Sequence, residues 1–520
     1  MTMFKRFVNL ELSRNQQTLI NITAAVLNML VTTAISFVLS PYIVATLGVE
    51  ANGFVGLANN FINYVSLVST ALNSMGSRFM MMAYYNNEYE KFRRYYSSLL
   101  FANLGIATVF GILGSACVWK LEYIVVIPAA LVADVKRLFA LVFANYVVTT
   151  MLTVWSTAPF IKNRLYLNSI TNTASAAIRG LMILGLFLCL EPSVSFLGIA
   201  TLVSGTVTHL LQCVYKQTLF PKLKAKLADF SWSAICEMLS SGIWNTVSCL
   251  GLILTGGVDL LVTNLFISAT AMGTLSVAQT MPVFVNTLNE TIANVFAPSL
   301  IIDYAQGKVE NIVKTIRQSA KIISVVCSLP LGFLLVYGEE FYQLWQPTQD
   351  AHLLYTLSVI IIIGRVFFTG MQPLFSVFTV VNKVRQNSLV IIANGIASVS
   401  LMFLLLQYTD LGIYAVAGTS VVCCFIKNIC FVIPFSAKYL GLKATTFYPM
   451  LIPSITCSLL LVLWGMLLKH FICPASWLGL IMTGVLFAGI GIFLTSYIIL
   501  SKEERARLTE TLKHKFLRNH

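Results

Sequence analysis

The chain has 520 residues, of which 57% are hydrophobic and 10% are charged, and its mean hydropathy is +0.82. Soluble domains carry about 25% charged residues, so this composition excludes a soluble globular protein and indicates a chain that crosses a membrane many times. The net charge of +14 does not indicate nucleic-acid binding, because the basic residues are dispersed over many short loops instead of gathering on one face.

Fourteen apolar segments are long enough to cross a bilayer, which takes about 20 residues. The sequence therefore predicts an all-α polytopic membrane protein with fourteen transmembrane helices. In chain order the predicted spans lie near residues 18–47, 53–83, 96–118, 137–160, 167–190, 194–214, 238–265, 273–301, 318–338, 353–380, 388–407, 412–435, 448–468 and 477–499.

The two ends of the chain are more polar than these spans. Residues 1–17 are predicted to form a cytoplasmic or interfacial N-terminus. The basic segment 501–520 is predicted to be a short cytoplasmic helix, since Leu508, Leu512 and Phe516 recur every four residues beside cations. Such an amphipathic stripe is typical of a helix that lies on the inner leaflet.

Positive charge follows the loops in an alternating pattern. When the fourteen spans are placed with both termini in the cytoplasm, 26 of the 34 Lys and Arg residues fall on the cytoplasmic side. The opposite side holds only Lys120, Lys136, Arg137 and Lys469. Cytoplasmic loops are enriched in Lys and Arg, so the pattern predicts an N-in, C-in topology.

An internal repeat is visible at an offset of 220 residues. The segment that opens at Gly53 aligns without gaps with the one that opens at Gly273, and Tyr84 then matches Tyr304. Each segment is the second span of a six-helix block. Repeats of this kind are typical of alternating-access carriers, in which the substrate site lies between the halves.

The repeat divides the membrane region into domains. Residues 18–220 are predicted to form an N-lobe of spans 1–6, and residues 221–440 a C-lobe of spans 7–12. Residues 441–500 hold the two additional spans, 13 and 14.

Four cations remain inside the apolar spans, namely Arg78, Arg179, Arg365 and Lys427. A cation at the centre of a membrane helix costs about 2.5–3.5 kcal/mol on insertion scales. These four cations are therefore expected to have a structural or functional role. Arg179 and Arg365 lie near mid-membrane and are the strongest candidates for binding a substrate, with a structural hydrogen bond as the alternative. Arg78 and Lys427 lie nearer the inner surface, which their side chains can reach by snorkelling.

Two acidic residues also lie within spans. Asp259 falls in span 7 and Glu290 in span 8. Either carboxylate is a candidate to bind a coupling proton or Na⁺, or to neutralise a buried Arg. The sequence thus suggests that transport is coupled to a proton or Na⁺ gradient. The sequence predicts no bound cofactor or metal.

Motifs of soluble enzyme chemistry are missing from the sequence. There is no G-x-x-x-x-G-K-[ST] phosphate-binding loop, no H-E-x-x-H and no G-x-S-x-G. The loops are too short to hold a catalytic domain, and a glycan polymerase would be expected to carry a large outer loop. Transport, with no enzymatic activity, is the function class that remains.

Several patches resemble a known family. The first span contains Pro41-Tyr42 and ends in Leu47-Gly48, and Arg78 closes the second span, which opens at Gly53. The seventh span, with Asp259, and the segment FYQLWQP after the ninth resemble the same proteins. These are the bacterial polysaccharide-unit flippases of the O-antigen type, which belong to the multidrug/oligosaccharidyl-lipid/polysaccharide exporter superfamily.

The resemblance implies a substrate and a location. Such a flippase moves an oligosaccharide repeat unit, linked to undecaprenyl pyrophosphate, from the inner to the outer leaflet of the bacterial cytoplasmic membrane by alternating access. The implied partners are this lipid-linked oligosaccharide, membrane lipids and the polysaccharide polymerase and export machinery. A lipid II flippase and a cation-coupled multidrug exporter of the same superfamily are the alternatives.

Overall fold

The computed structural model describes residues 14–501 and 504–505. Most of the N-terminal segment 1–17 and of the C-terminal tail 501–520, including Leu508, Leu512 and Phe516, lies outside the described residues. Within the described part every regular element is a helix. This confirms the predicted all-helical fold class.

The chain forms two compact units. Unit 1 comprises Met1–Val277 with Ile391–Val399, and unit 2 comprises Ala278–Val390 with Ser400–His520. Two helices contribute residues to both units, namely α12 (Ala269–Asn294) and α18 (Val384–Tyr408). The predicted division into lobes at 18–220 and 221–440 concerns the repeat and stays a prediction.

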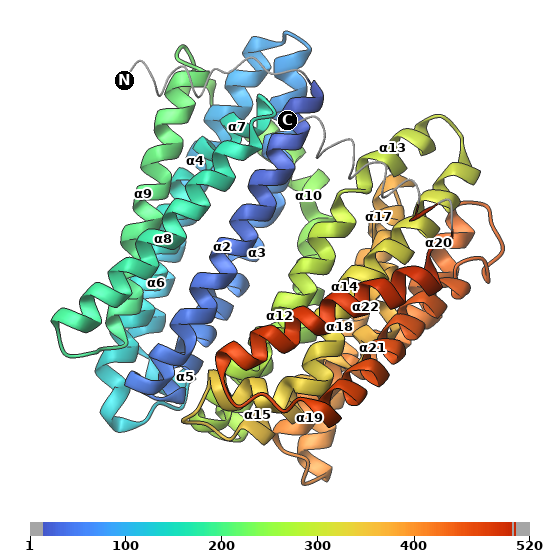
Figure 1. The fold of residues 1–520 in the computed structure, drawn as a ribbon. Helices are drawn as coiled ribbons and strands as arrows, with labels where there is room; N and C mark the ends of the chain where they lie inside the picture. Colours follow the sequence, from blue (N-terminus) through green and yellow to red (C-terminus); the bar gives the residue numbers. More distant parts are fainter. Residues whose placement is uncertain (1–13, 502–503, 506–520) are drawn as a thin grey trace, which may run out of the picture. The chain divides into compact units, whose positions relative to one another are not determined.

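The helices of unit 1 run side by side for much of their length (Figure 1). Its elements, where η marks 3-10 or π segments, are α2 (Arg14–Leu47), α3 (Val49–Tyr85), α4 (Tyr89–Trp119), α5 (Leu121–Ile124), η1 (Ala129–Leu131), α6 (Val132–Leu152), η2 (Thr153–Ser156), α7 (Thr157–Ile161), α8 (Leu165–Cys189), α9 (Ser195–Leu219), η3 (Leu227–Asp229), α10 (Trp232–Leu252), η4 (Ile253–Gly257) and α11 (Asp259–Phe266).

Unit 2 is organised around one long helix, α14, against which α21 and α22 pack. Its elements are α13 (Ala297–Ala305), α14 (Val309–Trp345), α15 (Ala351–Ile362), α16 (Arg365–Phe368), η5 (Thr369–Met371), α17 (Gln372–Val380), α19 (Ile413–Lys427), η6 (Asn428–Val432), α20 (Ile433–Tyr439), η7 (Tyr448–Met450), α21 (Leu451–Phe471) and α22 (Trp477–Ile499).

Each of the fourteen predicted spans coincides with a helix or a run of short helices. Twelve helices of the described chain are long and apolar enough to cross a membrane. The two predicted spans that are absent from this set are formed by α3, with 37 residues, and α12, with 26, which are long but more polar. The count of fourteen crossings and the N-in, C-in orientation therefore stay predictions.

The predicted repeat has a counterpart in the backbone. Asn87 and Gly307, which are 220 positions apart, both have positive φ angles, of 60° and 68°. Asn163 and Asn382, 219 positions apart, have φ angles of 55° and 56°. Each residue follows the end of a helix, where Gly and Asn are the residues that most readily adopt the left-handed conformation. The two halves of the chain thus end matching helices in the same way.

The repeated segments also contact each other within unit 1. The N-terminal part of α3 crosses the N-terminal part of α12 so closely that a Cβ on Gly53 would lie 2.8 Å from Cα of Gly273. A Cβ on Gly273 would lie 2.3 Å from the carbonyl oxygen of Val49. The Thr270 hydroxyl donates to the Glu50 carboxylate over 2.6 Å beside this crossing. Only glycine allows the two backbones to approach so closely.

We predict that Gly53→Ala destabilises the protein by about 1–3 kcal/mol, because the added methyl forces these backbones apart. Thermal unfolding of the purified protein in detergent measures the effect. Gly185→Ala is the matched control, since a Cβ at Gly185 on α8 meets no atom within 4 Å; it should be neutral or slightly stabilising. Equal unfolding temperatures for the two variants would contradict the prediction.

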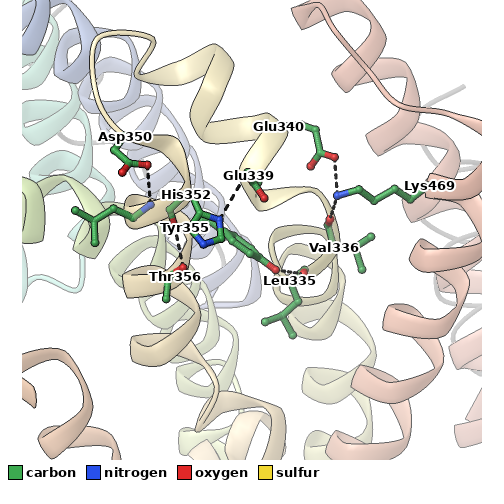
Figure 2. Close-up of polar contacts among 10 residues, drawn as sticks. Leu335, Val336, Glu339, Glu340, Asp350, His352, Tyr355, Thr356 and Lys469 are labelled. Carbon is green, nitrogen blue, oxygen red and sulfur yellow. Dashed lines mark hydrogen bonds and ion pairs between the residues drawn. The ribbon is translucent and has the colours of Figure 1, made fainter. Parts of the chain in front are cut away.

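An ion pair fastens α21 to α14. Figure 2 shows Lys469 reaching from α21 to two acceptors on α14. Its Nζ lies 2.5 Å from Glu340 Oε1 and donates to the carbonyl oxygen of Val336 over 2.9 Å. The Glu340 side chain is only 17% exposed. Removing one partner of this buried pair costs more stability than removing one partner of a surface ion pair, because the remaining carboxylate would stay desolvated.

The same end of α14 is bonded to α15. Tyr355 donates its hydroxyl to the carbonyl oxygen of Leu335 over 2.7 Å, and His352 Nδ1 lies 3.5 Å from Glu339 Oε1 (Figure 2). Asp350 caps α15 by accepting from the amide of Leu353. Together with the Lys469 contacts, these bonds fix the ends of three helices of unit 2 to one another.

Lys469→Met should lower the stability of the protein by about 1–3 kcal/mol, because it leaves the Glu340 carboxylate without its charged donor. The double variant Lys469→Met/Glu340→Gln should regain much of this loss, since no lone charge remains. Lys91→Met is the control, because its pair with Glu88 is exposed on both sides and contributes little. The prediction fails if the double variant unfolds at the same temperature as the single one.

Candidate functional site

Arg179 lies midway along α8 in unit 1. Residues 174–177 of α8 are Ala or Ser, and Gly180 lets α8 approach α2, since a Cβ there would lie 3.0 Å from Ile35 Cγ2. The Arg179 side chain is half-buried and has no hydrogen-bond acceptor or ion-pair partner in the part of the chain that the structure describes. The structural hydrogen bond that the sequence left open is thus not found among these residues.

Arg365 occupies a helix break in unit 2. The tenth predicted span is interrupted after Ile362, and Arg365 is the first residue of the short helix α16. The half-buried side chain lies within electrostatic range of Glu290 on α12. Glu290 itself is exposed and accepts a hydrogen bond from Asn286 Nδ2 over 3.0 Å. Neither a hydrogen bond nor an ion pair joins Arg365 and Glu290 among the described residues, so their interaction is a longer-range electrostatic one.

Arg78 and Lys427 lie in different surroundings. Arg78 is exposed near the C-terminal end of α3 in unit 1. Lys427, the last residue of α19 in unit 2, is half-buried, and its Nζ lies 5.8 Å from the ring centroid of Phe375. An aromatic face attracts a cation at this distance. Lys427 thus has a local partner, whereas Arg78 has none among the residues that the structure describes.

Asp259 lies in the interior of unit 1, with 6% of its surface exposed. It begins α11 directly after the π-helical segment η4, and a carboxylate is favoured at a helix N-terminus. Tyr64 of α3 donates its hydroxyl to the carbonyl oxygen of Gly257 in η4 over 2.5 Å, and it lies within electrostatic range of Asp259. A buried carboxyl group in this setting is chemically able to hold a proton or a monovalent cation.

One polar surface was missed by the sequence reasoning, and it runs along α3. Between residues 51 and 80 the exposed side chains are Asn59, Asn63, Ser74 and Arg78, together with Val68. At about 100° per residue the four polar side chains fall within an arc of about 100°, and Val68 lies outside it, about 130° from its middle. The signal in the sequence was the spacing of four between Asn59 and Asn63 and between Ser74 and Arg78.

The matching helix of the repeat, α12, also exposes polar side chains, but they share its surface with an apolar one. On α12, Thr287 and Glu290 are exposed and Asn286 is half-buried, and the exposed Val283 lies one turn before Thr287 on the same side of the helix. The helices α3 and α12 are also the two predicted spans that are not among the apolar helices. Polar side chains within membrane helices rarely face lipid, and they more often face protein or water.

The chain is similar to known membrane proteins in sequence and in structure. No protein-family model matches the chain. It is 27% identical over 489 residues to a protein named "Uncharacterized membrane protein EpsK" from Bacillus subtilis (strain 168), covering 94% of this chain and 96% of that protein. Its structure is similar to that of the lipid II flippase MurJ in an inward closed conformation, with a TM-score of 0.63 at 13% identity, covering 93% of this chain and 100% of MurJ.

A second structural likeness is to the inward-facing conformation of a multidrug resistance MATE family transporter of the MOP superfamily. The TM-score is 0.58 at 15% identity, and the likeness covers 85% of this chain and 93% of that one. The chain has the fold of the MOP-superfamily transporters. It is thus a multi-pass membrane protein with a transporter fold, as predicted. The narrower family, the O-antigen type of flippase, stays a prediction.

If the polar face of α3 lines an aqueous route, a cysteine placed on it should react readily with a charged, water-soluble maleimide. We expect Asn63→Cys to be labelled at least several-fold faster than Val68→Cys, because thiol ionisation needs water. Mass spectrometry of the α3 peptide in membranes distinguishes the new cysteine from the native ones. Equal labelling rates at the two positions would show that the two faces of α3 do not differ in access to water.

Proposed function

We propose that this protein is a flippase that moves an oligosaccharide linked to undecaprenyl pyrophosphate from the inner to the outer leaflet of the bacterial cytoplasmic membrane by alternating access. The observation that carries the proposal is Arg179, a half-buried cation midway along a membrane helix that has no partner within the described chain. An uncompensated guanidinium is costly in a membrane, so an anionic cargo would give it a function.

A lipid pyrophosphate fits this requirement. A guanidinium presents five N–H donors in a rigid plane and binds phosphate oxygens in a bidentate way. Arg179 and Arg365 supply one such group in each unit, and Arg78 and Lys427 are additional cations for the diphosphate. A carrier of cationic drugs would instead be expected to present acidic groups, which argues against the multidrug exporter.

The carboxylates suggest how transport is driven. We include in the proposal that a proton or Na⁺ couples to the cycle at Asp259 or Glu290. Asp259 is buried beside Tyr64, and Glu290 lies near Arg365. Charge on Glu290 would compete with an anionic cargo for the same guanidinium, and a bound cation would remove that competition.

The surface-polysaccharide polymerase and export machinery are the proposed partners, because they would receive the flipped unit. A lipid II flippase is the second candidate, since the likeness to MurJ extends over 93% of the chain. Deletion of the gene separates the two: loss of surface polysaccharide in viable cells supports the first, and lysis with accumulation of the cell-wall precursor supports the second.

Arg179→Ala and Arg365→Ala should each reduce surface polysaccharide at least tenfold while the protein stays in the membrane, because a bidentate phosphate contact is lost. Extracted polysaccharide and membrane immunoblots measure the two quantities. Arg137→Ala is the matched control, since Arg137 lies at the surface in an exposed pair with Asp134. Normal polysaccharide in both test variants would contradict the assigned site.

A further inference from the structure

Asn59 and Asn63 of α3 are exposed within a predicted membrane span, and neither side chain has a hydrogen-bond partner anywhere in the described chain. Transfer of an unpaired amide from water to hydrocarbon costs roughly 2–7 kcal/mol, depending on the reference state. Two such groups on adjacent turns would be an expensive surface to present to lipid tails. Their partners are therefore polar and come from outside the described chain, as water or as hydrogen-bonding groups of a ligand.

The orientation of α3 supports this reading. Asn63 lies only about 40° from Asn59 around the helix axis, while the exposed Val68 lies about 180° from Asn59. The helix thus has one exposed apolar side, which suits lipid, and one exposed polar side, which does not. Ser74, farther along the polar side, receives a hydrogen bond from Asn245 Nδ2 of α10 over 3.4 Å, so neutral amide and hydroxyl groups continue along this surface.

The chemistry of the surface changes along its length. Its N-terminal part carries the uncharged Asn59 and Asn63, about 6 Å apart along the axis, and its C-terminal part ends in the cation Arg78, about 22 Å beyond Asn63. Each carboxamide has two N–H donors and one acceptor oxygen. This combination matches neighbouring hydroxyls of a sugar ring, each of which both donates and accepts, and the separate cation matches an anion.

We propose that Asn59 and Asn63 bind hydroxyl groups of the sugar part of the cargo, and so distinguish a glycosylated lipid pyrophosphate from the bare lipid. This inference rests on the proposed flippase function and adds the part of the protein that senses the sugar. The cationic residues hold the pyrophosphate of either lipid, whereas the asparagines contribute only when a sugar is attached.

Native mass spectrometry of the purified full-length protein tests this with two probes, undecaprenyl pyrophosphate and the same lipid carrying one N-acetylglucosamine. The wild type should bind the glycosylated lipid at least tenfold more tightly. Asn59→Leu/Asn63→Leu should abolish that preference with little change in binding of the bare lipid. Asn59→Gln/Asn63→Gln should retain part of the preference because it keeps the amides, and Val68→Leu should retain all of it.

The outcomes separate this inference from the function on which it rests. Equal binding of the two lipids by the wild type, or an unchanged preference in the Leu double variant, overturns the sugar site but leaves the flippase intact. The proposed function itself is contradicted if the wild type binds neither lipid, or if Arg179→Gln binds both lipids as tightly as the wild type does. A dimer in the wild type that dissociates in the Leu variant would show that the asparagines face a second copy of the chain, which also overturns the sugar site.

Discussion

A polar side chain at the depth of the lipid tails must find a partner, because the hydrocarbon offers none. The chain meets this constraint in two ways. Asn73 and Asn103 satisfy each other, with amide hydrogen bonds of 3.2 and 2.8 Å between α3 and α4. Arg179 and Asn63 have no such partner in the described chain. The first pair holds two helices together, whereas the second set keeps its donors available for a partner outside the described chain.

This constraint also bears on α3 and α12, which are long helices in the structure but are not among the helices that are apolar enough to cross a membrane. Both are long enough to cross a membrane, yet each contains enough polar residues to fall outside the apolar set. Both were predicted as spans from the length of their apolar segments, and the alternation of basic loops agreed with that count. Polarity that is confined to one side of a helix, as on α3, is concealed by an average along the chain.

Sequence reasoning located the helices and the cations but not their surroundings. Each predicted span has a helix because apolar length is a local property. That Arg365 lies at a break and near Glu290 depends on residues 75 positions away along the chain, and that Tyr64 meets Gly257 beside Asp259 depends on a π-helical segment. Such pairings arise from tertiary packing and leave no periodic signal in the sequence.

The close approach of Gly53 to Gly273 has an evolutionary consequence. In an isologous dimer, residues at the two-fold axis meet their own copies. Here residues that are 220 positions apart meet in the same way, with Gly53 against Gly273 and Glu50 bonded to Thr270. A six-helix ancestor that paired with itself would have required glycine at this one position. Duplication and fusion of its gene would convert that self-contact into a contact between two different parts of one chain, after which each glycine is constrained by the other.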